Sequence, residues 1–189
     1  MRGIPSPFKP KTNKYLIPGQ FWGIPLQNGK YACGRVVELP PKGYGPGERV
    51  HFLVGLMDWV GDELPTFESI ADHKILDQGV AHLMTIWRNG EKILGQRPLE
   101  LDNLEPFYFI GTSERNISSK EGDVLLVRGF KFIRYLTKDE KKKFPLDLEN
   151  NPQGMLDDSM IIYGKKSVWG FNVIRLLAED YYSKGLLKL

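Results

Sequence analysis

The stretch "GQFWGIPLQNGKYACGRVVEL", residues Gly19 to Leu39, has two runs rich in β-branched and aromatic residues on either side of Asn28-Gly29. Both residues of an Asn-Gly step tolerate positive φ, so this step is a favoured turn of a β-hairpin. Pro25 has no amide hydrogen for a strand ladder, which predicts an edge position or a bulge. The stretch therefore predicts a β-hairpin that begins the fold.

The rest of the chain predicts further strands and few helices. A Pro- and Gly-rich loop leads to a third strand over residues 49–60. Residues 61–77 are polar and predict a loop with one short helix. Residues 80–95 contain a second Asn-Gly step, Asn89-Gly90, and predict a second hairpin. The other β-rich runs are residues 106–112 and residues 122–137.

The C-terminal third carries the helical patterns. Residues Lys138 to Lys143 predict a short helical turn that Pro145 stops. After Ser167, apolar residues recur at intervals of three and four, which predicts an amphipathic helix that ends near Gly185. The apolar positions are Trp169, Val173, Ile174, Leu177 and Tyr181.

About six strands and one late helix predict an α+β fold. We expect a strongly curved antiparallel sheet or a small β-barrel, closed by the C-terminal amphipathic helix. Residues 1–14 contain three prolines and few apolar residues, so they predict an extended N-terminal arm. Residues 15–189 are then expected to form a single α+β domain.

Composition and cysteine content exclude several classes of protein. A chain of 189 residues with 41% hydrophobic residues can bury a sizeable core. No apolar run approaches the roughly 20 residues of a membrane span, and the N-terminus lacks the apolar centre of a secretory signal. The single cysteine, Cys33, cannot form an internal disulfide. We therefore expect a cytoplasmic protein that does not insert into a membrane.

No group of residues has the spacing of a catalytic or metal site. Cys33 would need a base to act as a nucleophile, and a free cysteine in a strand is more often a small buried hydrophobic residue. The histidines His51, His73 and His82 are 22 and 9 residues apart, without the spacing of a zinc site. We expect no catalytic, cofactor-binding or metal-binding residues, and so no enzyme.

Charge is distributed unevenly along the chain, although its net value is only +3. Residues 1–49 have 8 basic and 2 acidic side chains. Residues 50–112 have 4 basic and 10 acidic side chains, and residues 113–189 have 14 basic and 11 acidic side chains. A small barrel with exposed aromatic and basic side chains could bind single-stranded nucleic acid, with the lysines of residues 138–143 on phosphates. The acidic middle third would repel a phosphate backbone, so this function is the weaker alternative. The side chains that could line such a face are Tyr31, Arg35, Arg128, Lys131 and Arg134.

Two blocks of the chain resemble a known family. "PGQFWGIPLQNGKYACGRVV", residues 18–37, is similar to the pattern G-D-x-F-x-I-P-L-x-D-G-x-Y-x-x-G-R-V at the start of the immunity protein 26 family of bacterial polymorphic-toxin systems. "WRNGEKILGQRPL", residues 87–99, resembles the later segment of that family, where a turn leads to an Ile/Leu-Gly pair and a Pro-Leu. Gln20 replaces the acidic residue before the first strand, and Gln27-Asn28 replaces the acidic turn.

The resemblance implies a non-enzymatic α+β antitoxin that binds a cognate toxin and blocks its activity; it leaves the oligomeric state open. The toxins of this family often look like nucleases, which present a basic face to their substrate. An acidic surface could bind such a face, and residues 57–77 hold most of the acidic residues of the middle third. The alternative is an ordinary solvated acidic loop. The predicted toxin-binding residues are Asp58, Trp59, Asp62, Glu63, Phe67, Glu68, Asp72 and Asp77.

Overall fold

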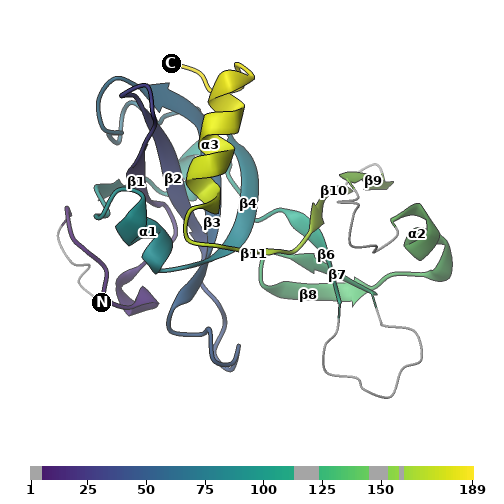
Figure 1. Cartoon of the computed structure of the whole chain (residues 1–189). Coiled ribbons are helices and arrows are strands. Elements are labelled where there is room, and N and C mark those ends of the chain that lie inside the picture. The colour runs from purple at the N-terminus through teal and green to yellow at the C-terminus, as the bar shows by residue number, and fades with distance from the viewer. Residues whose placement is uncertain (1–5, 113–123, 145–152, 158–159) are drawn as a thin grey trace. The chain divides into compact units, whose positions relative to one another are not determined.

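Figure 1 shows the helices and strands of the computed structural model, which describes residues 6–112, 124–144, 153–157 and 160–189. The chain divides into two units. Unit 1 consists of residues 1–105 and 168–189, and unit 2 consists of residues 106–167. This division does not by itself set the number of domains, so the single domain expected over residues 15–189 stays a prediction.

Unit 1 is built on a six-stranded sheet with the strand order β11-β4-β3-β2-β1-β5. Strands β1 to β4 pair as antiparallel neighbours in chain order, and β11 runs parallel to β4. The strands are β1 Gln20–Pro25, β2 Tyr31–Glu38, β3 His51–Gly61, β4 Ile75–His82, β5 Gly95–Gln96 and β11 Val168–Trp169. The helices are α1 Met84–Arg88 and α3 Val173–Ser183, with the 3-10 helices η1 Asn13–Tyr15 and η2 Leu99–Asp102.

The hairpin predicted at Asn28-Gly29 is confirmed. β1 pairs with β2 so that Pro25 lies opposite Tyr31, and residues 26–30 form the turn. Gly29 has a φ of +85°, a conformation that glycine adopts without strain. Pro25 is the last residue of β1 and lies beyond the two residues that pair with β5. Its missing amide hydrogen is therefore outside the ladder between β1 and β5.

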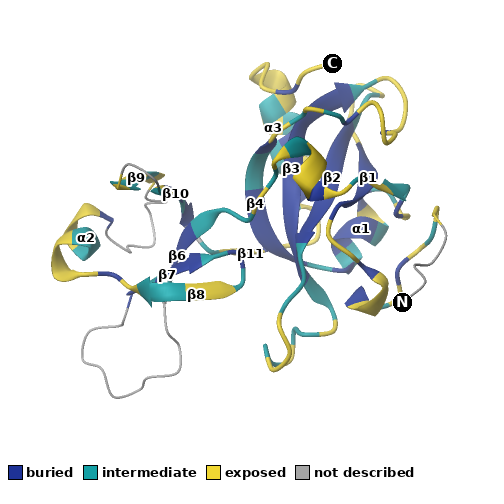
Figure 2. Cartoon of the chain, turned by 180° about the vertical axis from the view of Figure 1, so that it is seen from behind, coloured by how far each residue is buried: buried dark blue, intermediate teal, exposed yellow. Residues whose placement is uncertain are grey.

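Both faces of the central strands of unit 1 are buried, and Figure 2 shows β2 and β3 largely in dark blue. Every interior residue of β2 is buried. Ala32 and Val36 belong to the main apolar core, together with Ile174 of α3. Cys33 and Arg35 alternate with them and therefore lie on the opposite face of the strand. A strand covered on both faces has no solvent-facing side, so a charged residue such as Arg35 needs a partner inside the protein.

Unit 2 is a five-stranded sheet with the strand order β8-β7-β6-β10-β9. β6, β7 and β8 are antiparallel neighbours, whereas β10 runs parallel to β6. A small apolar core of this unit includes Ile110, Leu126, Phe144 and Ile162. The elements are β6 Tyr108–Thr112, β7 Val124–Arg128, β8 Lys131–Tyr135, α2 Lys138–Lys143, β9 Gln153–Asp157 and β10 Met160–Lys165.

The predicted α+β class is confirmed, but the expected single strongly curved sheet or small β-barrel is wrong. The described strands form two separate sheets, and neither closes on itself, because the strand orders end at β11 and β5 in one sheet and at β8 and β9 in the other. Hydrophobic patterns locate strands but do not say which distant strands pair. β5 and β11 have two residues each, too few to show a pattern at all.

The second hairpin predicted over residues 80–95 is wrong. Helix α1 follows β4 directly, and Asn89 is the residue that ends the helix. The side-chain amide of Asn89 donates hydrogen bonds to the carbonyls of Thr85 (2.8 Å) and Phe171 (2.7 Å). Gly90 follows with a φ of +155°. An Asn-Gly step can end a helix as well as turn a hairpin, because both sites require unusual backbone angles.

Two helix predictions are corrected and one is confirmed. The late helix begins at Val173 rather than near Ser167, because Trp169 is buried in strand β11. The short helix expected within residues 61–77 does not form, since residues 62–74 contain only turns and irregular backbone. The helical turn predicted over Lys138 to Lys143 is α2, and the predicted stop at Pro145 lies outside the described residues.

Residues 6–14, the described part of the expected arm, belong to unit 1 and pack against its other segments. Phe8 and Ile93 exchange two backbone hydrogen bonds of 3.0 and 2.9 Å. The indole N–H of Trp87 donates to the carbonyl of Pro10 at 2.6 Å. Residues 1–5 lie outside the described part of the chain. Among the residues that the structure describes, no helix is long and apolar enough to cross a membrane.

Gly34 lies directly against the ring of Trp22, so a methyl group at this position would overlap the ring. Both residues are buried. We expect Gly34→Ala to lower the free energy of unfolding by about 1–3 kcal/mol, because overpacking forces core side chains to move. Gly170→Ala is the control, since its Cβ would meet only Val173 Cγ2, at 3.6 Å. Chemical denaturation compares the two, and equal midpoints would contradict this packing.

Candidate functional site

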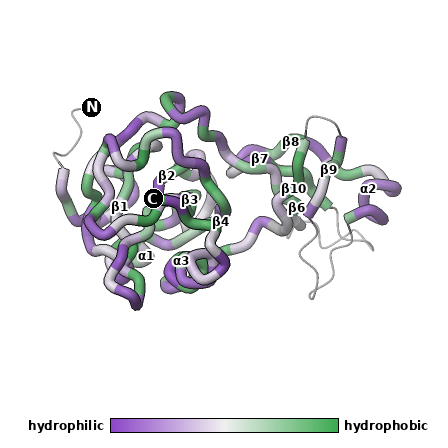
Figure 3. Tube along the Cα trace, turned by 90° about the horizontal axis from the view of Figure 1, so that it is seen from above, coloured by the Kyte–Doolittle hydropathy of each residue, from purple (hydrophilic) through white to green (hydrophobic). Residues whose placement is uncertain are grey.

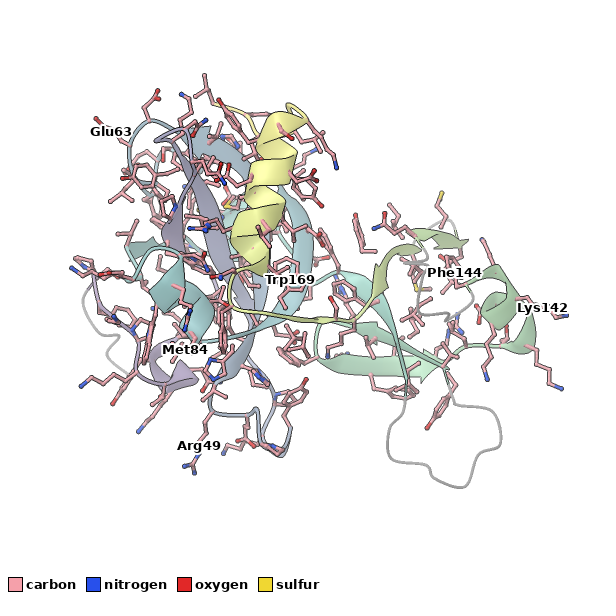
Figure 4. The ribbon with its side chains drawn as sticks, viewed as in Figure 1. Arg49, Glu63, Met84, Lys142, Phe144 and Trp169 are labelled. Carbon is pink, nitrogen blue, oxygen red and sulfur yellow. The ribbon has the colours of Figure 1, made fainter. Side chains whose placement is uncertain are left out.

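The loop between β3 and β4, residues 62–74, carries most of the predicted toxin-binding residues, and we call it the acidic loop. Its acidic residues are exposed, and Figure 4 shows Glu63 projecting away from the sheet. Phe67 is 41% exposed and Leu64 is 47% exposed. Exposed aromatic residues often anchor protein interfaces, and carboxylates add charge complementarity. The exposed acidic residues are Asp62, Glu63, Glu68 and Asp72.

Asp58 and Trp59 lie in β3 and are buried, at 3% and 5% exposure. Asp58 Oδ1 accepts the backbone N–H of Lys74 at 2.8 Å and lies 2.9 Å from His73 Nδ1. Its other oxygen lies 3.2 Å from Lys188 Nζ, in the C-terminal segment. Asp58 therefore fixes the end of the acidic loop from inside. Neither Asp58 nor Trp59 presents a surface for a partner in this structure.

Asp77 is half-buried in β4 and faces helix α3. The hydroxyl of Tyr181 donates a hydrogen bond to Asp77 Oδ2 at 3.1 Å, and the N–H of Gln78 donates to Oδ1 at 2.8 Å. Burial raises the pKa of Asp77, although these hydrogen bonds act in the opposite direction. Asp77 therefore attaches α3 to the sheet, outside the acidic loop.

Beneath the acidic loop lies a buried ionic group, which we call the Asp102 cluster: Arg35, Arg97 and Asp102. Arg35 Nη1 lies 3.0 Å from Asp102 Oδ2, and both side chains are 0% exposed. Arg97 Nη2 donates to Asp102 Oδ1 at 2.8 Å, and Arg97 Nε lies 2.9 Å from both carboxylate oxygens. Arg35 also donates to the backbone carbonyls of Arg97 and Pro98. One carboxylate thus joins strand β2 to the segment that follows β5.

The electrostatics of the cluster keep Asp102 ionised. Burial by itself would raise the pKa of Asp102, but hydrogen bonds from Arg97, from the backbone N–H of Asp72 and from Arg35 outweigh burial and lower it. The hydrogen bond between Arg97 and Asp102 also raises the pKa of Arg97. Buried charges persist in proteins when they are paired and hydrogen-bonded, as these are.

The Asp102 cluster also holds the acidic loop in place. Asp102 Oδ1 accepts the N–H of Asp72 at 3.2 Å. Asp72 has a φ of +62°, a left-handed conformation that aspartate tolerates better than most residues. The guanidinium of Arg97 lies 4.7 Å from the centre of the Phe67 ring, within the range of a cation–π contact. The loop is therefore fixed at two points, at Asp72 by the carboxylate of Asp102 and at Phe67 by Arg97, which binds the same carboxylate.

Sequence reasoning missed Asp102, although it quoted both of its arginine partners. Arg35 is in the first family-like block and Arg97 is in the second. Strand alternation places Arg35 on the same face as Cys33, and Cys33 was expected to be buried. A buried arginine requires a carboxylate partner, so the signal existed. The burial of Arg35 indicates that its partner is acidic but does not indicate where that partner lies. Asp102 is 67 residues away from Arg35 in the sequence.

Cys33 and the three histidines do not come together in one site. Cys33 is fully buried, as predicted, and burial raises the pKa of its thiol to about 12. The thiolate is therefore disfavoured near neutral pH. His51 and His82 lie side by side on β3 and β4, with ring centres 5.8 Å apart, whereas His73 contacts Asp58. Within the described residues, no three His, Cys, Asp or Glu side chains are grouped to hold a metal ion.

The five side chains expected on one face of a single sheet belong to two different sheets. Tyr31 and Arg35 belong to β2 in unit 1, and Arg35 is buried in the Asp102 cluster. Arg128, Lys131 and Arg134 belong to β7 and β8 in the sheet of unit 2. The single sheet face assumed for this weaker alternative is wrong, because the strands divide between two sheets.

Replacing Asp102 would leave two guanidinium groups without their carboxylate. We expect Asp102→Asn to lower the free energy of unfolding by about 3–5 kcal/mol, because breaking a buried ion pair leaves uncompensated charge. Asp180→Asn removes an exposed pair with Lys184 and should change stability by less than about 1 kcal/mol. Urea denaturation at neutral pH measures both. Similar losses in the two variants would show that the cluster is not a structural anchor.

The lowered pKa of Asp102 also predicts a pH dependence. A carboxyl group whose pKa is lower in the folded state stabilises the fold above its ordinary pKa of 3.8, and this contribution is lost as pH falls through the folded-state value. The stability difference between the wild type and Asp102→Asn should therefore be constant near neutral pH and shrink below about pH 4. Unfolding curves at a series of pH values check this, and a difference that grows on acidification would contradict it.

Comparison with known proteins gives one match. The family model named Immunity protein 26 matches residues 17–119, more than half of the chain. No curated protein and no solved structure matches the chain. The matched region includes the acidic loop and all three members of the Asp102 cluster. The two family-like blocks thus lie in one matched segment, and their arginines meet at one carboxylate. The chain belongs to the immunity protein 26 family.

Proposed function

We propose that this chain is an immunity protein that binds a cognate polymorphic toxin and neutralises it by direct contact in the cytoplasm. Its family membership supports this function. The buried thiol of Cys33, with its raised pKa, supports a role in binding over one in nucleophilic chemistry. A protein that must bind one toxin and reject its relatives needs a surface of defined shape and charge.

The observation that carries the proposal is that the acidic loop is fixed from inside. Asp102 accepts the N–H of Asp72, and Arg97, bound to the same carboxylate, lies over the ring of Phe67. A loop that is ordered before binding loses little conformational entropy on association. We therefore assign the toxin contact to the exposed residues of the loop, which are Asp62, Glu63, Phe67, Glu68 and Asp72.

The other three predicted residues have a supporting role in this proposal. Asp58 fixes the end of the loop through His73 and Lys74. Trp59 is buried beside Gly61, at the start of the loop. Asp77 binds α3 through Tyr181. Their substitution would alter toxin binding through the stability or the shape of unit 1.

The charge of the acidic loop fits a toxin with a basic face. Four carboxylates are exposed on it, and Lys74 is its single lysine. A nuclease presents such a face, because it neutralises the phosphates of its substrate. Opposite charges on two surfaces steer the partners together and fix their register. We propose that the toxin is a nuclease and that the loop covers its substrate-binding face.

Reversing two charges in the acidic loop tests this assignment. Asp62 pairs with Lys30 at the surface, and Glu63 is exposed to solvent, so Asp62→Lys with Glu63→Lys should leave the fold intact. We expect the binding free energy for the cognate toxin domain to weaken by about 2 kcal/mol or more. Isothermal titration calorimetry measures the affinity, and a nuclease assay measures the loss of inhibition.

A charge-matched variant provides the control. Glu91→Lys with Asp180→Lys changes net charge by the same amount at exposed residues of unit 1 outside the loop, and we expect it to bind as the wild type does. Equal weakening in both double variants would mean that net charge alone matters. Unchanged binding in the loop variant would exclude the loop, and wild-type protein that does not bind the toxin would exclude the proposed function.

A further inference from the structure

Unit 1 has a cavity near the start of β3, at the end of that strand opposite to the acidic loop. Its volume is about 550 Å³, within the range of small-ligand sites. β3 is 11 residues long, so its two ends are roughly 35 Å apart. Figure 4 shows Arg49 and Glu63 at opposite ends of unit 1. We call the cavity the basic pocket, and its lining consists of residues 12–14 together with Leu39, Pro40, Glu48 and Arg49 from the loop between β2 and β3.

The two segments that line the basic pocket are joined by the buried side chain of Asn13. Its amide donates hydrogen bonds to the carbonyls of Glu48 (2.6 Å) and His51 (2.8 Å). The backbone N–H of Asn13 donates to the carbonyl of Arg49 at 3.1 Å. These three bonds fix the backbone of Lys14 relative to the backbone of Arg49. The pocket is therefore formed before a ligand arrives, which reduces the entropy lost on binding.

The charged side chains of the basic pocket have an excess of positive charge. Lys14 and Arg49 are exposed, and within the described part of the chain neither has an ion-pair partner. Lys14 Nζ lies 6.0 Å from the centre of the Tyr15 ring, at the outer limit of a cation–π contact. Glu48, the acidic residue of the lining, accepts the backbone N–H of Gly43 at 2.7 Å. Two cations and one carboxylate give the lining a net charge of +1.

The basic pocket also has apolar lining. Leu39 and Pro40 follow β2 directly, and Leu39 packs against the main core of unit 1. The methylene stems of Lys14 and Arg49 add apolar surface beneath their charged ends. An apolar group that enters the pocket would leave water, which favours binding in proportion to the area buried. The lining therefore suits a ligand that has both a negative charge and a small apolar group.

We propose that the basic pocket binds a carboxylate attached to a small apolar group. The guanidinium of Arg49 can donate two parallel hydrogen bonds to the two oxygens of a carboxylate. Lys14 supplies a second cation. A monoanion matches the net charge of the lining, whereas the double charge of a phosphate would be repelled more strongly by Glu48. Two sources have this chemistry: an acidic side chain beside an apolar residue in a peptide, and a small free carboxylic acid.

Titration of the full-length protein with isocaproate, followed by NMR, tests this proposal. Isocaproate combines a carboxylate with an apolar group of the size of a leucine side chain. We expect the backbone amide signals of Asn13, Lys14 and Arg49 to shift as isocaproate is added. Acetate lacks the apolar group and isocaproamide lacks the charge, so each should bind about tenfold more weakly or less. Inorganic phosphate should also bind more weakly than isocaproate.

Substitution of the two cations tests their role in binding. Arg49→Gln should weaken isocaproate binding by about tenfold or more, because the ion pair and its hydrogen bonds are lost. Lys14→Gln should weaken binding in the same direction. Arg175→Gln in α3 and Lys138→Gln in α2 are the controls, since both residues are exposed outside the pocket and Figure 3 shows α2 coloured as hydrophilic. Both controls should bind as the wild type does, and circular dichroism checks the fold of every variant.

A peptide probe distinguishes the two sources of the carboxylate. The tripeptide acetyl-Leu-Glu-Leu-amide carries an acidic side chain between apolar residues, and acetyl-Leu-Gln-Leu-amide is its uncharged match. If the acidic peptide binds as tightly as isocaproate or more tightly, the ligand is a segment of a protein partner, and weaker binding indicates a small free acid. Equal binding of isocaproate and isocaproamide, tighter binding of phosphate, or unchanged binding by Arg49→Gln would overturn the proposal. None of these measurements requires the toxin, so their outcome is independent of the proposed function.

Discussion

The carboxylate of Asp102, buried between the guanidinium groups of Arg35 and Arg97, is the interaction on which unit 1 depends. A charge removed from water is stable only when it is paired and hydrogen-bonded. Asp102 accepts hydrogen bonds from both arginines and from the backbone of Asp72. Through these contacts, one side chain joins the central strand β2, the segment after β5 and the acidic loop.

A second buried carboxylate, Asp58, also fixes the C-terminal end of the acidic loop. Asp58 contacts His73 and the backbone of Lys74, and it also pairs with Lys188 of the C-terminal segment. The acidic residues of this region therefore divide into two kinds. Buried carboxylates fix the backbone, and the exposed carboxylates of the loop lie at the surface. The acidic residues that are close together in the sequence therefore form an exposed loop and the buried carboxylates that hold it in place.

Local signals predicted elements well where the local sequence decides the structure. The hairpin at Asn28-Gly29 formed as expected, and so did the helix over Lys138 to Lys143, which has a capping box of its own. The same reasoning failed at Asn89-Gly90, because the side chain of Asn89 bonds to a carbonyl 82 residues away and ends a helix. Trp169 fits the helical pattern but is part of a strand, because β4 supplies a pairing partner there.

The sequence by itself determined the α+β class, the founding hairpin, the burial of Cys33 and the family, since each of these follows from residues close together in the chain. Tertiary structure alone decided that the strands form two sheets, and that Asp58 and Trp59 are buried while Asp62 and Glu63 are exposed. It also decided that Arg35 and Arg97 meet at Asp102. The physical reason is that pairing of distant strands and of buried charges depends on which segments meet in space. A pattern of residue types records the need for a partner but not its place.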